Sequence, residues 1–151
     1  CKGYKRENLP VTFRILEPSA GKGDIIKAFP KQAKNYIDCI EINKDLRNTL
    51  EGAGCRVVYD DFLDFNTPQQ YQAIIMNPPF INGSDIKHIK HALKMLADGG
   101  RLVAICADGP RQQAQLKPLA EDSGGYYEPL PAGTFEDKGT NVNTALLVIE
   151  G

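Results

Sequence analysis

The sequence lacks several features that would assign a protein class directly. It has no Trp, no C-x-x-C pair and no apolar run that approaches roughly 18 residues. The last absence excludes a membrane-spanning helix, so we expect no membrane partner. The opening stretch "CKGYKRENLP" is polar and basic, which is not typical of a signal peptide. We take residues 1–151 as a single domain. The sequence lacks an initiating Met, which leaves open that the domain is part of a longer chain.

Cysteine is too scattered for a metal site. The 4 Cys are Cys1, Cys39, Cys55 and Cys106, and no two are spaced as metal ligands usually are, so we expect no metal. Three of them lie in apolar, strand-like runs. This placement is typical of small buried side chains in a reducing compartment, and we expect a cytoplasmic protein.

Positively and negatively charged residues are present in nearly equal numbers. The 18 Lys and Arg face 19 Asp and Glu, which gives a formal net charge of −1. Proteins that hold nucleic acid unaided usually carry more positive charge. The balance therefore argues against a strong free-standing DNA-binding surface, although it leaves room for a nucleic-acid substrate.

What is present is a regular alternation of strand and helix patterns. We expect strands at 11–17, 36–42, 55–59, 73–77, 101–107, 126–130 and 144–150, and helices at 24–29, 43–53, 84–97 and 111–122, the last of them interrupted at Pro118. In the helix 84–97, Ser84 is the expected N-cap and "DGG" at 98–100 the expected end. A polar stretch separates the last two strands, which predicts an antiparallel hairpin. The alternation predicts an α/β fold, with a doubly wound, mostly parallel seven-stranded sheet and an antiparallel C-terminal hairpin strand.

Polar and glycine-rich segments follow the strands. "EPSAGKGD" at 17–24 contains Gly21 and Gly23, which would let a ligand approach the backbone. The segment fits neither a phosphate P-loop nor the dinucleotide fingerprint, because Ile26 occupies the third glycine position. A plain turn is an equally good interpretation. On its own, therefore, the glycine pair predicts little.

Acidic residues end the next two strands. Glu41 follows Glu17 by 24 residues, the spacing at which an acid accepts hydrogen bonds from ribose hydroxyls. Asp60, Asp61 and Phe62 come after the third strand, where a carboxylate could bind an adenine amino group and the ring could pack on the base. Taken singly, these acids are better explained as helix caps or solvated charges. Together with the glycine loop, in order at three successive strand ends, they favour a nucleoside-bearing ligand.

"IIMNPPF" at 74–80 ends a strand abruptly. Pro78 and Pro79 have no amide proton, so the strand must stop before them. Asn77 is then left at the carboxyl end of the strand, and the aromatic ring of Phe80 follows. Taken alone, the segment is better explained as a rigid turn.

Several segments together resemble a known family. "LEPSAGKGD", "IDCIEIN", "DDFLDF", "IIMNPPF" and "LADGGRLVAI" resemble, in this order, the motifs of class I S-adenosylmethionine-dependent methyltransferases. The resemblance runs from about residue 11 to the end, and it implies a Rossmann-like fold and S-adenosylmethionine as cofactor. The cofactor-binding residues that it implies are Glu17, Pro18, Ser19, Ala20, Gly21, Gly23, Asp24, Glu41, Ile42, Asp61, Phe62 and Asn77.

The segment "NPPF" resembles the branch of this family that methylates nitrogen. The Asn77 side-chain oxygen and the Pro78 carbonyl could each accept one N–H of an exocyclic amine and free its lone pair, while Pro79 holds them rigidly. Phe80 would stack on the target base. We therefore expect residues 77–80 to be catalytic. Carbon-5 cytosine methylation is rejected, because no Cys follows a Pro.

The substrate is indicated less specifically than the cofactor. The tail "GTFEDKGTNVNTALLVIE" resembles small phage-type DNA methylases and places Phe135 where they carry a second base-binding ring, although a core position suits Phe135 equally well. We expect methylation of adenine in DNA. Ribosomal RNA guanine methylation, release-factor glutamine methylation and a non-catalytic partner-binding role stay open.

Two further expectations concern partners. Lys87, His88, Lys90, His91 and Lys94 are expected on the polar side of the helix 84–97, where a solvated face is a better explanation than phosphate binding. The upstream F-x-T-P-type segment of many DNA amine methylases is absent, and there is no length for a target-recognition domain. Three interpretations therefore stay open: the chain is incomplete, it is itself a subunit, or it depends on a protein partner that supplies target recognition.

Overall fold

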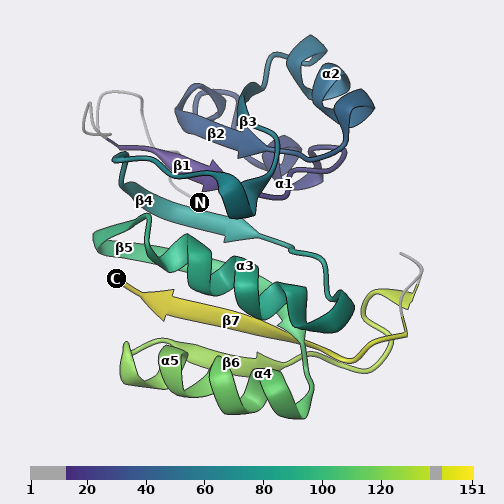
Figure 1. Ribbon diagram of the computed structural model, residues 1–151, viewed down its shortest axis with the longest axis vertical. Coiled ribbons are helices and arrows are strands. Elements are labelled where there is room, and N and C mark those ends of the chain that lie inside the picture. The colour runs from purple at the N-terminus through teal and green to yellow at the C-terminus, as the bar shows by residue number, and fades with distance from the viewer. Residues whose placement is uncertain (1–12, 137–140) are drawn as a thin grey trace.

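One mixed sheet organises the chain. The computed structural model describes residues 13–136 and 141–151. Seven strands form the sheet in the order β3-β2-β1-β4-β5-β7-β6 (Figure 1). Their bounds are β1 Ile15–Glu17, β2 Ile37–Ile40, β3 Arg56–Tyr59, β4 Tyr71–Met76, β5 Leu96–Ala107, β6 Tyr126–Pro129 and β7 Thr144–Glu150. The strands β1 to β5 pair in parallel, whereas β7 runs antiparallel to both β5 and β6. The expected fold class is confirmed, including the antiparallel C-terminal strands.

Helices cover both faces of the sheet. They are α1 Asp24–Ala28, η2 Lys34–Tyr36, α2 Lys44–Gly52, η3 Phe62–Asp64, η4 Ile81–Gly83, α3 Ser84–Leu93, α4 Pro110–Gln115 and α5 Lys117–Asp122. One apolar cluster joins Leu16 and Ile40 to α3 and α5, and a second joins the neighbouring Ile15 and Cys39 to α1 and α2. Successive strand residues point to opposite faces, so every residue of β1 and β2, which have helices on both sides, is buried. Figure 1 shows α3, α4 and α5 in front of the sheet.

The expected helix over 84–97 is wrong at both ends. Gly83 is the N-cap, with a left-handed φ of 70°, and Ser84 is the first helical residue. The helix ends at Leu93, and "DGG" lies inside β5. Gly100 suits that place because a Cβ would meet the Ala97 carbonyl oxygen at 2.8 Å, and Gly99 has a φ of +72°. The two glycines therefore permit an irregular strand instead of ending a helix.

The segment 111–122 contains a break, as expected, but not at the proline. The helix α4 ends at Gln115 and α5 begins at Lys117, so Leu116 is the junction. Pro118 lies in the first turn of α5, where a missing amide proton costs nothing. Leu116 is fully buried and anchors the junction in the core.

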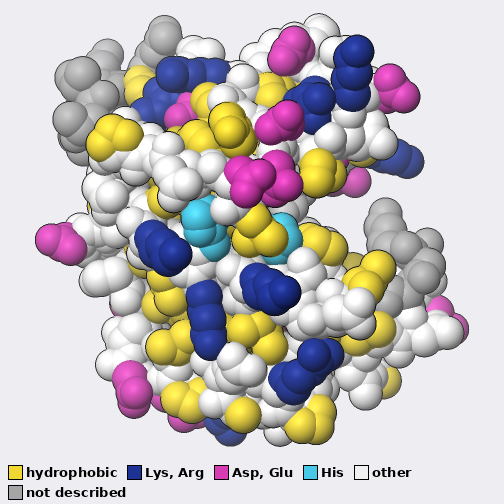
Figure 2. Space-filling model, viewed as in Figure 1, with side chains coloured by type: hydrophobic (Ala, Val, Ile, Leu, Met, Phe, Trp, Pro, Cys, Tyr) yellow, Lys and Arg dark blue, Asp and Glu magenta, His cyan; other side chains and the backbone are white. Residues whose placement is uncertain are grey.

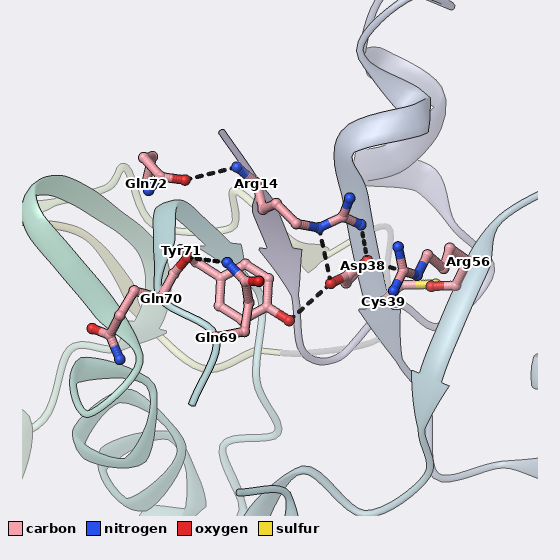
Figure 3. Close-up of polar contacts among 8 residues, drawn as sticks. All are labelled: Arg14, Asp38, Cys39, Arg56, Gln69, Gln70, Tyr71 and Gln72. Atoms are coloured by element: carbon pink, nitrogen blue, oxygen red, sulfur yellow. Dashed lines mark hydrogen bonds and ion pairs between the residues drawn. The ribbon is translucent and has the colours of Figure 1, made fainter. Parts of the chain in front are cut away.

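A buried carboxylate holds the amino ends of four strands together (Figure 3). Asp38 in β2 is 3% exposed and accepts hydrogen bonds from the Arg14 guanidinium and, at 2.9 Å, from the Tyr71 hydroxyl of β4. The Arg56 guanidinium of β3 lies 3.3 Å from the same carboxylate. The network lies at the sheet edge opposite to the strand ends where ligands bind in such folds.

Among the described residues, no helix is long and apolar enough to span a membrane.

Candidate active site

A cavity of about 650 Å³ lies at the carboxyl ends of the parallel strands. The loops that follow β1, β2, β3 and β4 each contribute to its wall, because parallel strands end at the same sheet edge. The residues that line it are Pro18, Ser19, Glu41, Ile42, Asp60, Asp61, Phe62, Leu63, Asn77, Pro78, Pro79, Phe80, Ser84 and His88. Most of the expected site residues are thereby brought together around one space.

Glu41 connects the first two loops. Its side chain is buried, and its two carboxylate oxygens accept hydrogen bonds from the Gly21 amide at 2.7 Å and the Asn43 amide at 2.8 Å. A carboxylate offers about four lone-pair sites, so roughly two remain for a ligand. Glu41 therefore both fixes the glycine loop and keeps capacity to accept hydrogen bonds from ribose hydroxyls.

The two glycines of the loop have different reasons to be glycine. Gly21 has a φ of +53° and free space where a Cβ would point. Gly23 has a φ of +79°, and a Cβ there would lie 2.9 Å from the Leu50 side chain of α2. Gly23 lines a separate pocket of about 110 Å³ between α1 and α2. The positive φ of Gly21 serves the loop at the cavity, whereas Gly23 serves helix packing.

Glu17 is a buried carboxyl with an unused oxygen. It is 1% exposed, and its Oε1 accepts the Ser19 amide at 3.0 Å. Its Oε2 has no hydrogen-bond partner among the described residues. The pKa of Glu17 is raised to about 8, mainly by burial; the hydrogen bond from the Ser19 amide opposes the rise, and the negative charge of Glu41 contributes to it. Glu17 directly precedes two residues of the cavity wall, Pro18 and Ser19.

The loop after β3 presents two acids and a ring. Asp61 is the N-cap of η3 and accepts the Leu63 amide at 3.1 Å, while Asp60 accepts the Asp61 amide at 2.7 Å. A capping role, one of the alternatives for these acids, is therefore observed. Phe62 is buried and lies edge-on to His91 with ring centroids 4.9 Å apart. The capped Asp61 carboxylate still lines the cavity and retains acceptor capacity.

Asn77 leaves β4 with its side chain uncommitted. It is exposed, and within the described part of the chain its amide makes no hydrogen bond. Pro78 is buried, and Phe80 is half-buried at the cavity wall. The loop closes at Gly83 in a left-handed conformation. An amide without an internal partner, next to a rigid Pro-Pro turn, is free to bind an external donor.

The sequence patterns missed three cavity residues, Leu63, Ser84 and His88. His88 Nδ1 lies 2.8 Å from the Ser84 carbonyl oxygen and 3.2 Å from its hydroxyl. The spacing of four residues places both on one side of α3, next to the N-P-P-F loop, and that spacing could have indicated them. His91, expected on the polar side of the helix, is buried, and its Nε2 lies 2.8 Å from the Phe65 carbonyl oxygen.

Several expected site residues do not line the cavity. They are Glu17, Ala20, Gly21, Gly23, Asp24 and Phe135. Asp24 is exposed on α1 and lies 3.4 Å from the Lys27 ammonium, while Phe135 is half-buried in the turn that follows β6. No cluster of His, Cys, Asp and Glu suited to a metal occurs in residues 13–136 and 141–151.

Comparison with known proteins places this geometry in a family. A model of the methyltransferase small domain matches residues 10–122. No curated protein sequence matches the chain. Similar solved structures include a protein from Pyrococcus horikoshii provisionally described as an RNA methyltransferase, with 16% identity, a TM-score of 0.63, and coverage of 90% of this chain and 73% of that one.

Two other structures have comparable folds. An rRNA methylase from Streptococcus thermophilus is 15% identical, with a TM-score of 0.58 and coverage of 96% and 90%. The M protein of the type I restriction enzyme EcoKI is 18% identical with a TM-score of 0.65, and the match covers 92% of this chain but 40% of that protein. Since the family model matches well over half of the sequence, the chain belongs to the methyltransferase small domain family, with the Rossmann-like fold of class I methyltransferases and S-adenosylmethionine as its cofactor.

Proposed function

We propose that the chain transfers a methyl group from S-adenosylmethionine to an exocyclic amine of a nucleic-acid base, with adenine in DNA as the favoured target. The observation that carries the proposal is the position of Asn77. Its uncommitted amide follows β4 and lines the same cavity as Glu41 and Asp61, two of the acids expected to bind the cofactor. A methyl acceptor bound at Asn77 would therefore share one space with the cofactor.

The residues of the cavity suit the cofactor chemically. Glu41 offers free acceptor capacity for ribose hydroxyls, and Asp61 and Phe62 offer a carboxylate and a ring for an adenine. The unpaired Oε2 of Glu17 would favour an ammonium group, because a cation stabilises the ionised carboxyl. When bound, S-adenosylmethionine supplies an electrophilic methyl group on a positively charged sulfur. The acids around the cavity complement that charge.

The chain would activate the amine by hydrogen bonding. The Asn77 Oδ1 and the Pro78 carbonyl oxygen are the expected acceptors for its two N–H groups, and the Pro-Pro turn limits their movement. A stacked base would lie on Phe80. Covalent chemistry through Cys39 or Cys106 is disfavoured, because burial raises the pKa of each thiol to about 12.

The choice of nucleic acid rests on the N-P-P-F segment and on the resemblance of the tail to phage-type DNA methylases. The fold neighbours include both an rRNA methylase and the EcoKI M protein, so RNA is the second candidate. A subunit that supplies target recognition remains part of the proposal. A cytoplasmic location is supported by the three described cysteines, which are all free thiols.

The test is label transfer from tritiated S-adenosylmethionine to DNA, RNA and protein, followed by nucleoside and amino-acid analysis. Asn77→Ala should lower turnover at least about tenfold, or 1.4 kcal/mol, and leave cofactor affinity nearly intact, because the amide bonds strengthen as the nitrogen becomes tetrahedral. Asn48→Ala, at an exposed position of α2, is the matched control. Normal turnover of the Asn77 variant would remove Asn77 from the mechanism. Label in guanosine or glutamine alone would overturn the adenine assignment.

A further inference from the structure

A second cavity adjoins the candidate active site. It has a volume of about 510 Å³ and lies between the N-P-P-F loop on one side and residues 107–112 on the other. Pro79 and Phe80 line both this cavity and the first one. A group bound in the second cavity would therefore be the immediate neighbour of a base stacked on Phe80. We call this second cavity the flanking groove.

The wall of the flanking groove is apolar and unusually exposed. Ile81 is 77% exposed and Val142 is 47% exposed, and both line it together with Phe80. Exposed apolar side chains that group around one groove are typical of an interaction site or a ligand-binding groove. An aromatic ring such as that of Phe80 binds nucleobases by stacking, without regard to base identity, and apolar side chains beside it add contact area.

A cation lies at the edge of the flanking groove. Arg111 at the start of α4 is exposed and lines the groove. Its guanidinium packs against the backbone of Gly83, since a Cβ on Gly83 would lie 3.1 Å from an Arg111 terminal nitrogen. None of the described acidic residues forms an ion pair with Arg111. An exposed guanidinium without an acidic partner is a suitable ligand for phosphate.

The charges around the groove are segregated, although their sum over the chain is close to zero. Figure 2 shows dark blue side chains over α3 and α4 and magenta ones gathered above α3. The exposed Lys87, Lys90 and Lys94 follow one side of α3 at steps of three and four residues, and the Lys90 ammonium donates to Gln115 of α4 at 2.7 Å. The protein therefore has a basic face beside the groove, although its net charge is −1.

We propose that the flanking groove binds the nucleotide next to the methylated one in a single strand, with its base against Phe80, Ile81 and Val142 and its phosphate at Arg111. This inference rests on the proposed function, because it assigns the substrate of that function a path across the protein. A base lies near its own phosphate, which matches an apolar wall with a cation at its edge. The exposed lysines of α3 are positioned to contact phosphates of the nucleic-acid strand beyond this nucleotide.

The first test measures binding of a short fluorescent single-stranded oligodeoxynucleotide by anisotropy, between 50 and 200 mM salt, in the presence of S-adenosylhomocysteine. Arg111→Ala should weaken binding roughly three- to tenfold at 50 mM salt, and it should reduce the slope of log affinity against log salt by about 0.7, the value for one phosphate contact on a single strand. Lys44→Ala removes the same charge from an exposed position at the start of α2 and should change neither quantity.

The second test separates the base from the phosphate. Ile81→Ala should weaken binding of an intact oligonucleotide at least roughly threefold, and this effect should vanish when the nucleotide next to the target is abasic. The Arg111→Ala effect should persist on the abasic strand, because the phosphate is still present. Both variants should retain the fold, because Ile81 and Arg111 are exposed.

Label transfer, measured in parallel, keeps this inference distinct from the proposed function. A protein that methylates nucleic acid but whose affinity and salt slope are unchanged by Arg111→Ala and Ile81→Ala overturns the groove assignment and leaves the function standing. Absence of label overturns the function, and the anisotropy results still decide the groove. Absence of oligonucleotide binding, or an acidic peptide that binds through Arg111 when oligonucleotides do not, overturns the groove assignment.

Discussion

Glu17→Gln should stabilise the free protein at neutral pH, and the gain should grow as the pH rises. Burial raises the pKa of the Glu17 carboxyl to about 8 in the folded protein, whereas in the unfolded chain the carboxyl ionises near its ordinary value of 4.5. Between these values the unfolded chain releases a proton that the folded protein keeps. The free energy of unfolding therefore falls as the pH rises through this window. The Gln variant has no such titration.

The size of the effect follows from the two pKa values. At 1.36 kcal/mol per pH unit, the stability of the variant relative to the parent should increase by about 2.5 kcal/mol between pH 5 and pH 7. Urea unfolding of both proteins at pH 5, 6 and 7 measures it, and taking the difference at each pH cancels the titration of all other groups. The amide of the variant adds a buried donor, whose cost is the same at every pH.

An exposed carboxylate provides the control. Glu51→Gln, on the exposed side of α2, is the matched control for the loss of a carboxylate. If the difference for Glu17→Gln is constant from pH 5 to pH 7, then Glu17 is ionised in the folded protein and the raised pKa is refuted.

Two further substitutions test cofactor binding by Glu41 and helix packing at Gly23. Glu41→Ala should weaken S-adenosylmethionine binding by roughly 1–3 kcal/mol in calorimetry, the scale of a lost charge-assisted hydrogen bond, and unchanged affinity would remove Glu41 from the cofactor site. Gly23→Ala should destabilise the protein by roughly 1–3 kcal/mol in urea, because the new Cβ meets Leu50 at 2.9 Å in a left-handed conformation. Gly52→Ala, where a Cβ meets nothing within 4 Å, should be close to neutral, and equal stabilities of the two glycine variants would contradict the packing role of Gly23.

The strand ends were the most predictable part of the site. Parallel strands end at one edge of a sheet, so polar residues that follow successive strands in the sequence must meet in space. The residues Glu41, Asp61 and Asn77 line one cavity for this reason. The same reasoning does not extend along a loop into the helix that follows. Gly23 and Asp24 were expected beside the ligand, but they are the N-cap and the first residue of α1 and lie outside the cavity wall.

The errors arose where one residue type serves two structures. Glycines such as Gly99 and Gly100 end helices, but they also permit irregular strands, and local sequence does not distinguish these uses. Leu96 fits the apolar spacing of a helix and also the start of β5, where it pairs with Tyr71. His91 follows a lysine in the sequence, yet it faces Phe62 because η3 packs on α3, and that contact is between distant segments.

The insertion of β7 between β5 and β6 has a consequence for how the chain folds. During synthesis, β5 is complete at Ala107, but its partner on that edge does not exist until Thr144–Glu150 has been made. The strand β6 precedes β7 in the sequence and has no place in the sheet before β7 arrives. An apolar edge on β5 therefore stays unpaired while the intervening residues are translated, and such edges recruit other chains. We expect the nascent chain to depend on chaperones most strongly in this interval, and refolding from denaturant to be limited by the docking of β7.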